Sequence, residues 1–200
     1  MIAGIKKIHW AALLFSAALI VVFSWFFVLK EYQQQRLLTF LRPAANPLGS
    51  GYNVAQSIIA VGAGQLTGRG LGFGSQSQLH FLPEAQTDFI FSVIAEELGF
   101  AGTMAVVALY GIVLWRLTRI ARQAENDFAA YAVIGIGLMI SIHIVLNVGA
   151  AIGLLPVTGL PLPFLSYGGT ALIITMSLIG VAESIAQSNF TNRQQAVLYG

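Results

Sequence analysis

The chain has 200 residues, of which 56% are hydrophobic and only 9% are charged, and its mean hydropathy is +0.77. Soluble domains contain roughly 25% charged residues, so this composition excludes an ordinary soluble domain and predicts an all-α membrane protein. The net charge of +2 is small and scattered, and it gives no reason to expect a nucleic acid partner. The chain has no cysteine, which excludes disulfide bonds and thiolate metal sites.

The first apolar segment, residues 11–29, is long enough to cross a membrane. A secretory signal peptide is the alternative interpretation of such a segment near an N-terminus. However, the apolar core of a signal peptide is only about 7–15 residues long, and the aromatic residues around Phe26 make a poor cleavage site. We therefore expect a transmembrane span here, preceded by a cytoplasmic N-terminus at residues 1–10.

A long polar segment, residues 30–87, is expected to form an extracytoplasmic loop with short helical pieces. Residues 33–41 predict an amphipathic helix that ends before Pro43. Residues 54–66 are apolar but too short to span, which indicates an interfacial or re-entrant piece. The glycines that follow, around Arg69, match neither a P-loop nor a dinucleotide-binding fingerprint and are typical of turns.

Three further apolar segments predict spans at residues 88–115, 128–150 and 164–186. The connection at residues 116–127 contains three arginines, whereas residues 151–163 contain no Lys or Arg. The positive-inside rule therefore places residues 116–127 and the tail at 187–200 in the cytoplasm, and residues 151–163 outside. The predicted fold is a bundle of four transmembrane helices with a long extracytoplasmic loop and both termini in the cytoplasm.

Four carboxylates gather at the edge of the second predicted span, at Glu84, Asp88, Glu96 and Glu97. Acidic side chains cost about 2.5–3.5 kcal/mol at the centre of a bilayer, so they normally face a bundle interior or a wet cavity. Thr87 or Asp88 could cap the start of the helix, and a carboxylate at that position could also act as a base. Counting along a helix places Glu96 about 12 Å deeper than Asp88 and near its face, with Glu97 rotated away. For Glu96 and Glu97 a purely structural pair is the alternative.

Other polar residues accompany these carboxylates. His143 and Asn147 share a face of the third predicted span, where hydrogen bonding between helices explains them and a ligand role is the alternative. On the side of Asp88, cationic and polar side chains could bind an anionic lipid headgroup; they are Arg69, Gln76, Ser77, Gln78 and His80. No residues have the spacing of a metal site.

Three runs of sequence carry a family resemblance: GYNVAQSIIAVGAG at 51–64, GSQSQLHFLPEAQTDFIFSVIAEELG at 74–99 and GLLPVTGLPLPFLSYGGT at 153–170. In these runs the chain resembles the SEDS family (RodA/FtsW) of peptidoglycan polymerases, and QSQLHFLPE and LLPVTG are most similar to its rod-shape branch. The resemblance extends from the first span to about Ser188. Because SEDS proteins have a ten-span fold, it implies that this chain is a C-terminal portion containing the last four spans.

The resemblance implies a glycosyltransferase that polymerises lipid II into glycan strands on the outer face of the bacterial cytoplasmic membrane, for cell elongation and rod shape. It implies that Asp88, in the run TDFIF, is essential, and such a carboxylate could accept the proton of an attacking sugar hydroxyl. Further residues are expected to bind substrate: Arg69, Gln78, His80, Glu84 and Glu96. Cationic residues or a divalent ion such as magnesium could balance the diphosphate charge.

The implied partners are lipid II, the membrane lipids and a class B penicillin-binding protein, which is a transpeptidase. Two other functions stay open at this point. One is a lipid II flippase, and the other is a non-catalytic membrane scaffold for the penicillin-binding protein.

Overall fold

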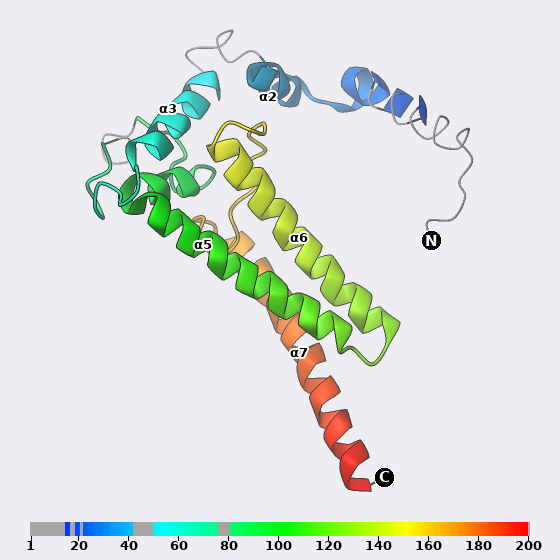
Figure 1. The fold of residues 1–200 in the computed structure, drawn as a ribbon. Helices are drawn as coiled ribbons and strands as arrows, with labels where there is room; N and C mark the ends of the chain where they lie inside the picture. The colour runs from blue at the N-terminus through cyan, green and yellow to red at the C-terminus, as the bar shows by residue number, and fades with distance from the viewer. Residues whose placement is uncertain (1–14, 17–18, 21, 42–49, 76–80, 200) are drawn as a thin grey trace.

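The computed structural model describes residues 15–16, 19–20, 22–41, 50–75 and 81–199, with side chains up to Asn189. This part of the chain is helical and contains no strand. Its elements are η1 (Ser24–Val28), α2 (Glu31–Leu41), α3 (Ser50–Ala63), α5 (Ile90–Arg122), α6 (Asp127–Ala151) and α7 (Gly169–Tyr199). Figure 1 shows α5, α6 and α7 as three long helices, with α2 and α3 at one end of them.

Three helices are long and apolar enough to cross a membrane: Ile90–Arg122, Asp127–Ala151 and Gly169–Asn189. In their most apolar windows only 11 to 22% of the residues are buried inside the protein, so most apolar side chains point outward. Outward-facing apolar surface on helices of this length suits lipid rather than water. The predicted all-α membrane fold is therefore confirmed. Within the predicted span at residues 11–29, residues 11–14, 17–18 and 21 lie outside the described residues and Ser24–Val28 form η1, so a complete span here stays a prediction.

The arginines of the predicted loop at residues 116–127 are helical. Helix α5 continues to Arg122, so Arg116 and Arg119 also lie near its C-terminal end, and residues 123–126 alone connect it to α6. Cations near the C-terminus of a helix interact favourably with the helix dipole, which explains why the helix extends through them. The Asn126 side chain then caps α6 by accepting a hydrogen bond from the N–H of Ala129 at 2.7 Å.

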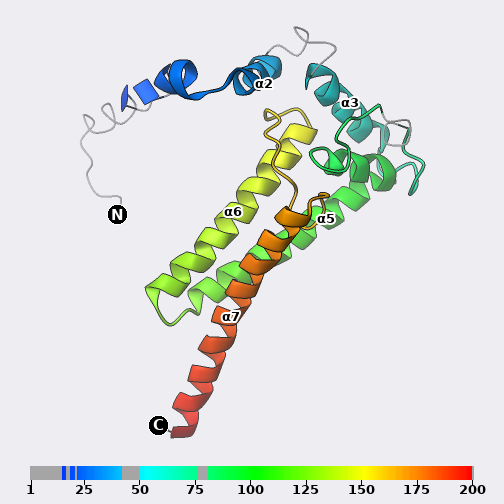
Figure 2. The ribbon, with the colours of Figure 1, turned by 180° about the vertical axis from the view of Figure 1, so that it is seen from behind.

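Two clusters of buried apolar side chains join the long helices. The cluster near the arginine end of α5 consists of Leu117, Ile120, Val133, Ile136, Ile140 and Ala182. The cluster nearer to α3 consists of Phe91, Tyr110, Ala151 and Leu162. Figure 2 shows residues 152–168 returning from the end of α6 to the start of α7, which brings this connection beside the start of α5.

Helix α5 is interrupted at Gly99, which has φ 69° and ψ −165°. The interruption leaves the carbonyls of Glu96 and Glu97 without partners inside the helix. They accept hydrogen bonds from the N–H groups of Arg69 at 2.9 Å and Gly70 at 3.0 Å. The glycine-rich segment is therefore not just a series of turns, because it packs into the break in α5.

Two more backbone hydrogen bonds fasten this segment to the far side of the break. The N–H of Phe100 donates to the carbonyl of Gln65 at 2.8 Å, and the N–H of Ala101 donates to that of Leu66 at 3.1 Å. The two backbones approach so closely that a Cβ atom at Gly64 would lie 1.7 Å from a backbone oxygen of α5. The segment after α3 thus fixes the position of the first part of α5.

Candidate functional site

Asp88 lies in a tight turn that precedes α5. The carbonyl of Glu84 accepts hydrogen bonds from the N–H groups of Thr87, Asp88 and Phe89 at 3.1 to 3.3 Å. The Thr87 hydroxyl donates to the Glu84 carboxylate at 2.8 Å. Helix α5 begins only at Ile90, and its N-cap residue, Phe89, makes no side-chain cap. The interpretation of Thr87 or Asp88 as a helix cap is therefore wrong, and the Asp88 carboxylate is not used for capping.

Three consecutive carbonyls of this turn, at residues 86–88, are held by donors from other parts of the chain. In that order, they accept hydrogen bonds from the N–H of Tyr167 at 2.8 Å, the hydroxyl of Ser166 at 2.6 Å and the side-chain amide of Asn147 at 3.0 Å. Asn147 belongs to α6, and the other two precede α7. Folding of the bundle therefore fixes the backbone that carries Asp88, as a preorganised site requires.

Asn147 and His143 both bind backbone carbonyls of the connection between α6 and α7. Asn147 donates a second hydrogen bond to Leu160 at 3.0 Å, and Nδ1 of His143 lies 3.2 Å from the carbonyl oxygen of Pro161. Both residues form hydrogen bonds, but the prediction that these bonds join two helices is wrong, because their partners lie in a loop and in the turn of Asp88.

Arg36 of α2 faces Asp88 across Gly159. A Cβ atom on Gly159 would lie 3.2 Å from Nη1 of Arg36 and 3.8 Å from Oδ2 of Asp88. These two distances place the guanidinium and the carboxylate within about 7 Å of each other. Arg36 also donates to the carbonyl of Val157 at 3.4 Å. Sequence analysis missed Arg36 because nothing in its spacing connects it with Asp88.

Burial raises the pKa of the half-buried Asp88 carboxyl above the ordinary value of 3.8. The positive charge of Arg36 opposes this increase, and the negative charge of Glu84 adds to it. Asp88 precedes the membrane-spanning helix. A carboxyl that keeps its proton to a higher pH than an exposed aspartate is suited to exchanging protons with a substrate.

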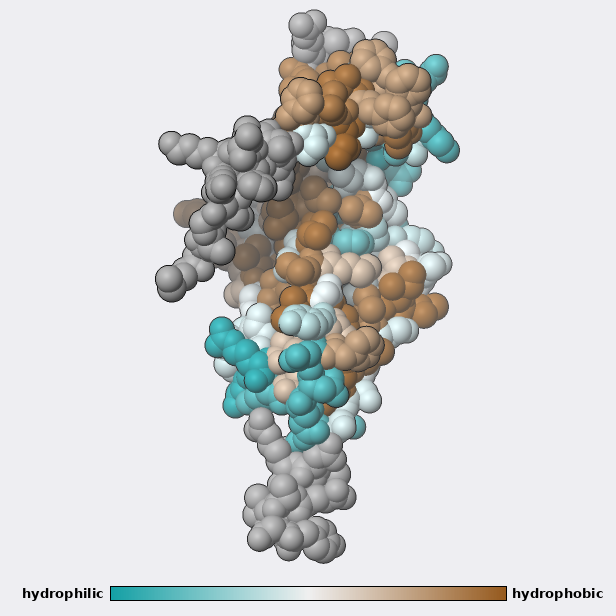
Figure 3. Space-filling view, turned by 90° about the vertical axis from the view of Figure 1, so that its right-hand side faces the viewer, coloured by the Kyte–Doolittle hydropathy of each residue, from teal (hydrophilic) through white to brown (hydrophobic). Residues whose placement is uncertain are grey.

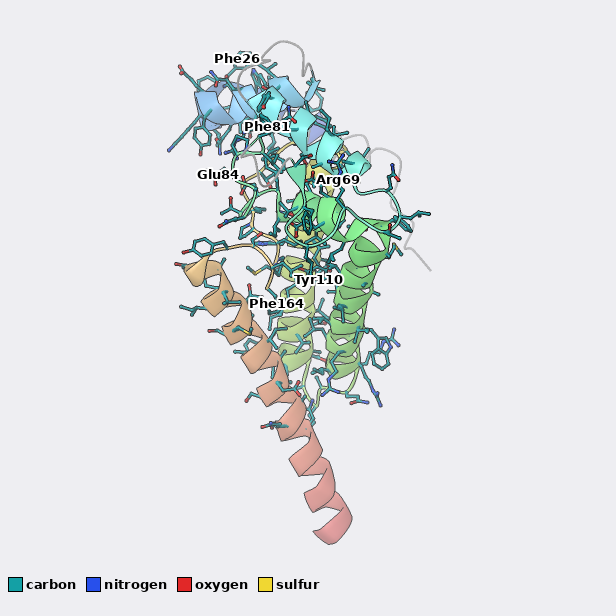
Figure 4. The ribbon with its side chains drawn as sticks, turned by 90° about the vertical axis from the view of Figure 1, so that its left-hand side faces the viewer. Phe26, Arg69, Phe81, Glu84, Tyr110 and Phe164 are labelled. Atoms are coloured by element: carbon teal, nitrogen blue, oxygen red, sulfur yellow. The ribbon has the colours of Figure 1, made fainter. Side chains whose placement is uncertain are left out.

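Two cavities lie on either side of the Thr87–Ser166 hydrogen bond. The first, of about 640 Å³, is lined by residues 82–87, the first turns of α5 and Tyr167, and Glu84 is among its polar groups. The second, of about 320 Å³, lies between α6, residues 161–166 and the start of α7, and its lining is mostly apolar. Figure 4 shows Glu84 above the start of α7, and Phe164 beside the start of α7.

Arg69 and Glu96, which sequence analysis grouped with Asp88, belong to a second cluster. Arg69 donates to the hydroxyl of Ser75 at 2.7 Å, and that hydroxyl donates to the Glu96 carboxylate at 3.3 Å. Glu96 is fully buried. Figure 4 shows Arg69 well separated from Glu84, and the charges that act on Asp88 are those of Arg36 and Glu84.

Glu97, not Glu96, shares a cavity with Glu84 and Thr87. The helical count from Asp88 placed Glu96 near the face of Asp88 and Glu97 rotated away. Asp88 is not among the residues that line this cavity, and α5 begins two residues after Asp88, so that placement stays a prediction. The other predicted substrate residues, Gln78 and His80, and the neighbouring Gln76 and Ser77 lie outside the described residues.

Among the described residues, no group of three or more His, Asp or Glu side chains is placed to hold a metal ion. A divalent ion such as magnesium stays a prediction from the sequence.

Comparison with known proteins finds relatives along almost the whole chain. The family model for FtsW, RodA and SpoVE, described as a cell cycle protein, matches residues 1–191. The peptidoglycan glycosyltransferase MrdB of Escherichia coli K12 is 47% identical over 161 residues, which are 80% of this chain and 44% of MrdB. The chain spans about half the length of the curated relatives that it matches.

Two solved structures have a similar fold. A chain of a peptidoglycan synthase complex, solved to explain how polymerization and crosslinking are coordinated, is 32% identical with a TM-score of 0.70. The match covers 94% of this chain and 51% of that one. The rod shape determining protein RodA of Thermus thermophilus is 28% identical with a TM-score of 0.50, over 78% of this chain and 56% of RodA.

Proposed function

Because the chain belongs to the FtsW, RodA and SpoVE family of cell cycle proteins, we propose that it carries the catalytic carboxylate of a peptidoglycan glycosyltransferase that polymerises lipid II. The family is the one that the sequence motifs predicted. The observation that carries the proposal is Asp88, a half-buried carboxylate on a backbone held by three hydrogen bonds from α6 and the segment before α7. Its position at the edge of a membrane-spanning helix suits a substrate that is anchored in lipid.

In the proposed reaction, the Asp88 carboxylate accepts the proton of an acceptor sugar hydroxyl as the hydroxyl oxygen attacks the anomeric carbon of the donor. The bond from that carbon to the lipid diphosphate breaks, and the diphosphate leaves as an anion. A sugar hydroxyl is too weak an acid to ionise at neutral pH, so the reaction needs a base. The leaving diphosphate is already a stable anion, so no second carboxyl is required as a general acid, in contrast to glycosidases.

The two cavities beside the Thr87–Ser166 contact support a substrate with a polar and an apolar part. The larger cavity offers the carboxylates of Glu84 and Glu97 as acceptors for sugar hydroxyl groups. The smaller one has a mostly apolar lining that suits part of a lipid chain. Glu84 therefore stays a proposed substrate residue, and Glu97 joins it.

The proposal is tested by Asp88→Asn in the full-length protein, supplied with purified lipid II in detergent. The substitution keeps the size of the side chain but removes the base, so glycan chains on a gel should decrease by at least about 100-fold. Asp127→Asn, which changes an exposed aspartate at the other end of the molecule, is the matched control and should leave polymerisation intact. Undiminished polymer from the Asp88 variant would exclude Asp88 as the base.

The same assay separates the two alternative functions. Neither a flippase, which moves lipid II between leaflets, nor a non-catalytic scaffold makes glycan in detergent, and the function of a scaffold in cells would tolerate Asp88→Asn. We propose a class B penicillin-binding protein as partner, because the relative in the solved synthase complex belongs to an assembly that couples polymerization with crosslinking. We also propose that the Asp88 end faces the outside of the cytoplasmic membrane and the arginine end of α5 the cytoplasm.

A further inference from the structure

We propose that Arg36 is a positioning residue for Asp88, so that helix α2 forms part of the site. The inference rests on the proposed function, since it concerns the carboxylate that takes the proton. Arg36 and Asp88 both approach Gly159, at 3.2 and 3.8 Å from where a Cβ atom on it would lie.

Arg36 and Asp88 lie near each other without forming an ion pair. Within the described part of the chain, the one ion pair closer than 4.0 Å joins Arg116 and Glu183, so Arg36 and Asp88 do not close on each other. The bond to the carbonyl of Val157 uses one of the five N–H donors of the guanidinium. The remaining donors are free to point toward the carboxylate or toward a substrate oxygen between the two groups.

Gly159 allows both charged groups to approach the same backbone position. Its φ of +74° favours glycine, and a Cβ atom there would lie only 3.2 Å from Nη1 of Arg36. The bond from Arg36 to Val157 anchors α2 to the same connection two residues earlier. The loop between α6 and α7 therefore determines how far Arg36 can move from Asp88.

Among the described residues, Arg36 is the cation that acts on Asp88. Glu84, the other charged group acting on Asp88, is negative. On α6 the nearby polar groups are Asn147 and the titratable His143, Nδ1 of which lies 3.2 Å from the carbonyl oxygen of Pro161. Residues 153–163 contain no Asp, Glu, Lys, Arg or His. In α3 the one titratable residue is a tyrosine.

The test compares Arg36→Gln and Arg36→Lys with Gln35→Ala, an exposed neighbour on α2, in the full-length protein. Arg36→Gln removes the positive charge that opposes burial, so the pKa of Asp88 should rise. The acid limb of the kcat–pH profile should then move to higher pH, with about a tenfold or larger loss of kcat on that limb. Arg36→Lys keeps the positive charge, so its acid limb should lie close to that of the wild type, and Gln35→Ala should match the wild type.

A second readout does not depend on activity. Infrared absorption of ¹³C-labelled aspartate, taken as the difference from Asp88→Asn, follows the titration of the Asp88 carboxyl itself. Its midpoint should rise in Arg36→Gln and return toward the wild type in Arg36→Lys. An unchanged midpoint, or an equal loss of activity at every pH in both Arg36 variants, would overturn the inference. Normal polymerisation by Asp88→Asn would instead overturn the proposed function, whatever the Arg36 variants do.

Discussion

At the scale of single residues, Glu84 and Arg36 act on Asp88 in opposite directions. The Glu84 carboxylate raises the pKa of Asp88. Since Asp88 must be ionised to accept a proton, polymerisation should be lost as the pH falls through this pKa. Glu84→Gln removes a negative charge, so the pKa should fall and the acid limb of the kcat–pH profile should move to lower pH. Initial rates of polymerisation across a pH series measure the shift.

Glu97→Gln is the matched control for this prediction. Glu97 lines the same cavity as Glu84, but it is not among the charges that act on Asp88. Its substitution can change the binding of sugar hydroxyls, yet it should leave the acid limb in place. Equal shifts in both variants would show that the limb reports the cavity as a whole rather than the Asp88 carboxyl.

The sequence singles out Asp88 as the proposed base, but it does not reveal the residues around it. The run TDFIF and the cost of acidic residues beside a span single out this carboxylate. Arg36, Ser166 and Tyr167 have no spacing relation to it, because they meet it only when α2 and the segment before α7 fold against the start of α5. Arg69 has the charge expected for substrate binding, yet it bonds to Ser75.

At the scale of elements, the apolar segments predicted the three long helices well. They did not predict the local geometry that depends on backbone hydrogen bonds between distant segments. Hydropathy predicts that a span exists, since about 20 apolar residues are enough to cross a membrane. It does not reveal that α5 breaks at Gly99, because the break depends on hydrogen bonds to residues 65–70, distant in sequence.

Because of the break at Gly99, substitution by alanine should affect stability differently at two glycines of α5. At Gly99, with φ 69° and ψ −165°, an alanine would cost roughly 1–3 kcal/mol in backbone strain, and its Cβ would lie 2.3 Å from the N of Gly68. At Gly111 nothing lies within 4 Å, and alanine favours a helix over glycine by up to about 1 kcal/mol. Thermal unfolding in detergent should therefore give a lower Tm for Gly99→Ala and an unchanged or higher Tm for Gly111→Ala. Equal Tm values would show that the pairing at the break is not important for stability.

At the scale of the whole molecule, the two ends of the bundle differ in character. One end carries the turn of Asp88, α2 and α3, and the other carries Arg116, Arg119 and Arg122. Figure 3 shows hydrophilic side chains gathered toward the arginine end and hydrophobic ones over the helices and beyond them. The exposed Arg116–Glu183 pair joins α5 to α7 at 3.1 Å, and as a surface ion pair it contributes little stability, about 0–1 kcal/mol. The charge therefore matters more for orientation in the membrane than for folding.

The orientation can be measured because the chain has no cysteine of its own, so a single introduced thiol is the one reactive site in it. Thr158→Cys places a thiol in the exposed connection beside the site, and Gln123→Cys places one in the short connection after α5. Arginines are retained on the cytoplasmic side during insertion, so a membrane-impermeant maleimide should label Thr158→Cys on intact cells and reach Gln123→Cys only after permeabilisation. If Gln123→Cys alone were labelled on intact cells, the orientation would be the reverse of the proposed one. Asp88 would then lie on the cytoplasmic side, where an extracytoplasmic polymerase could not use it.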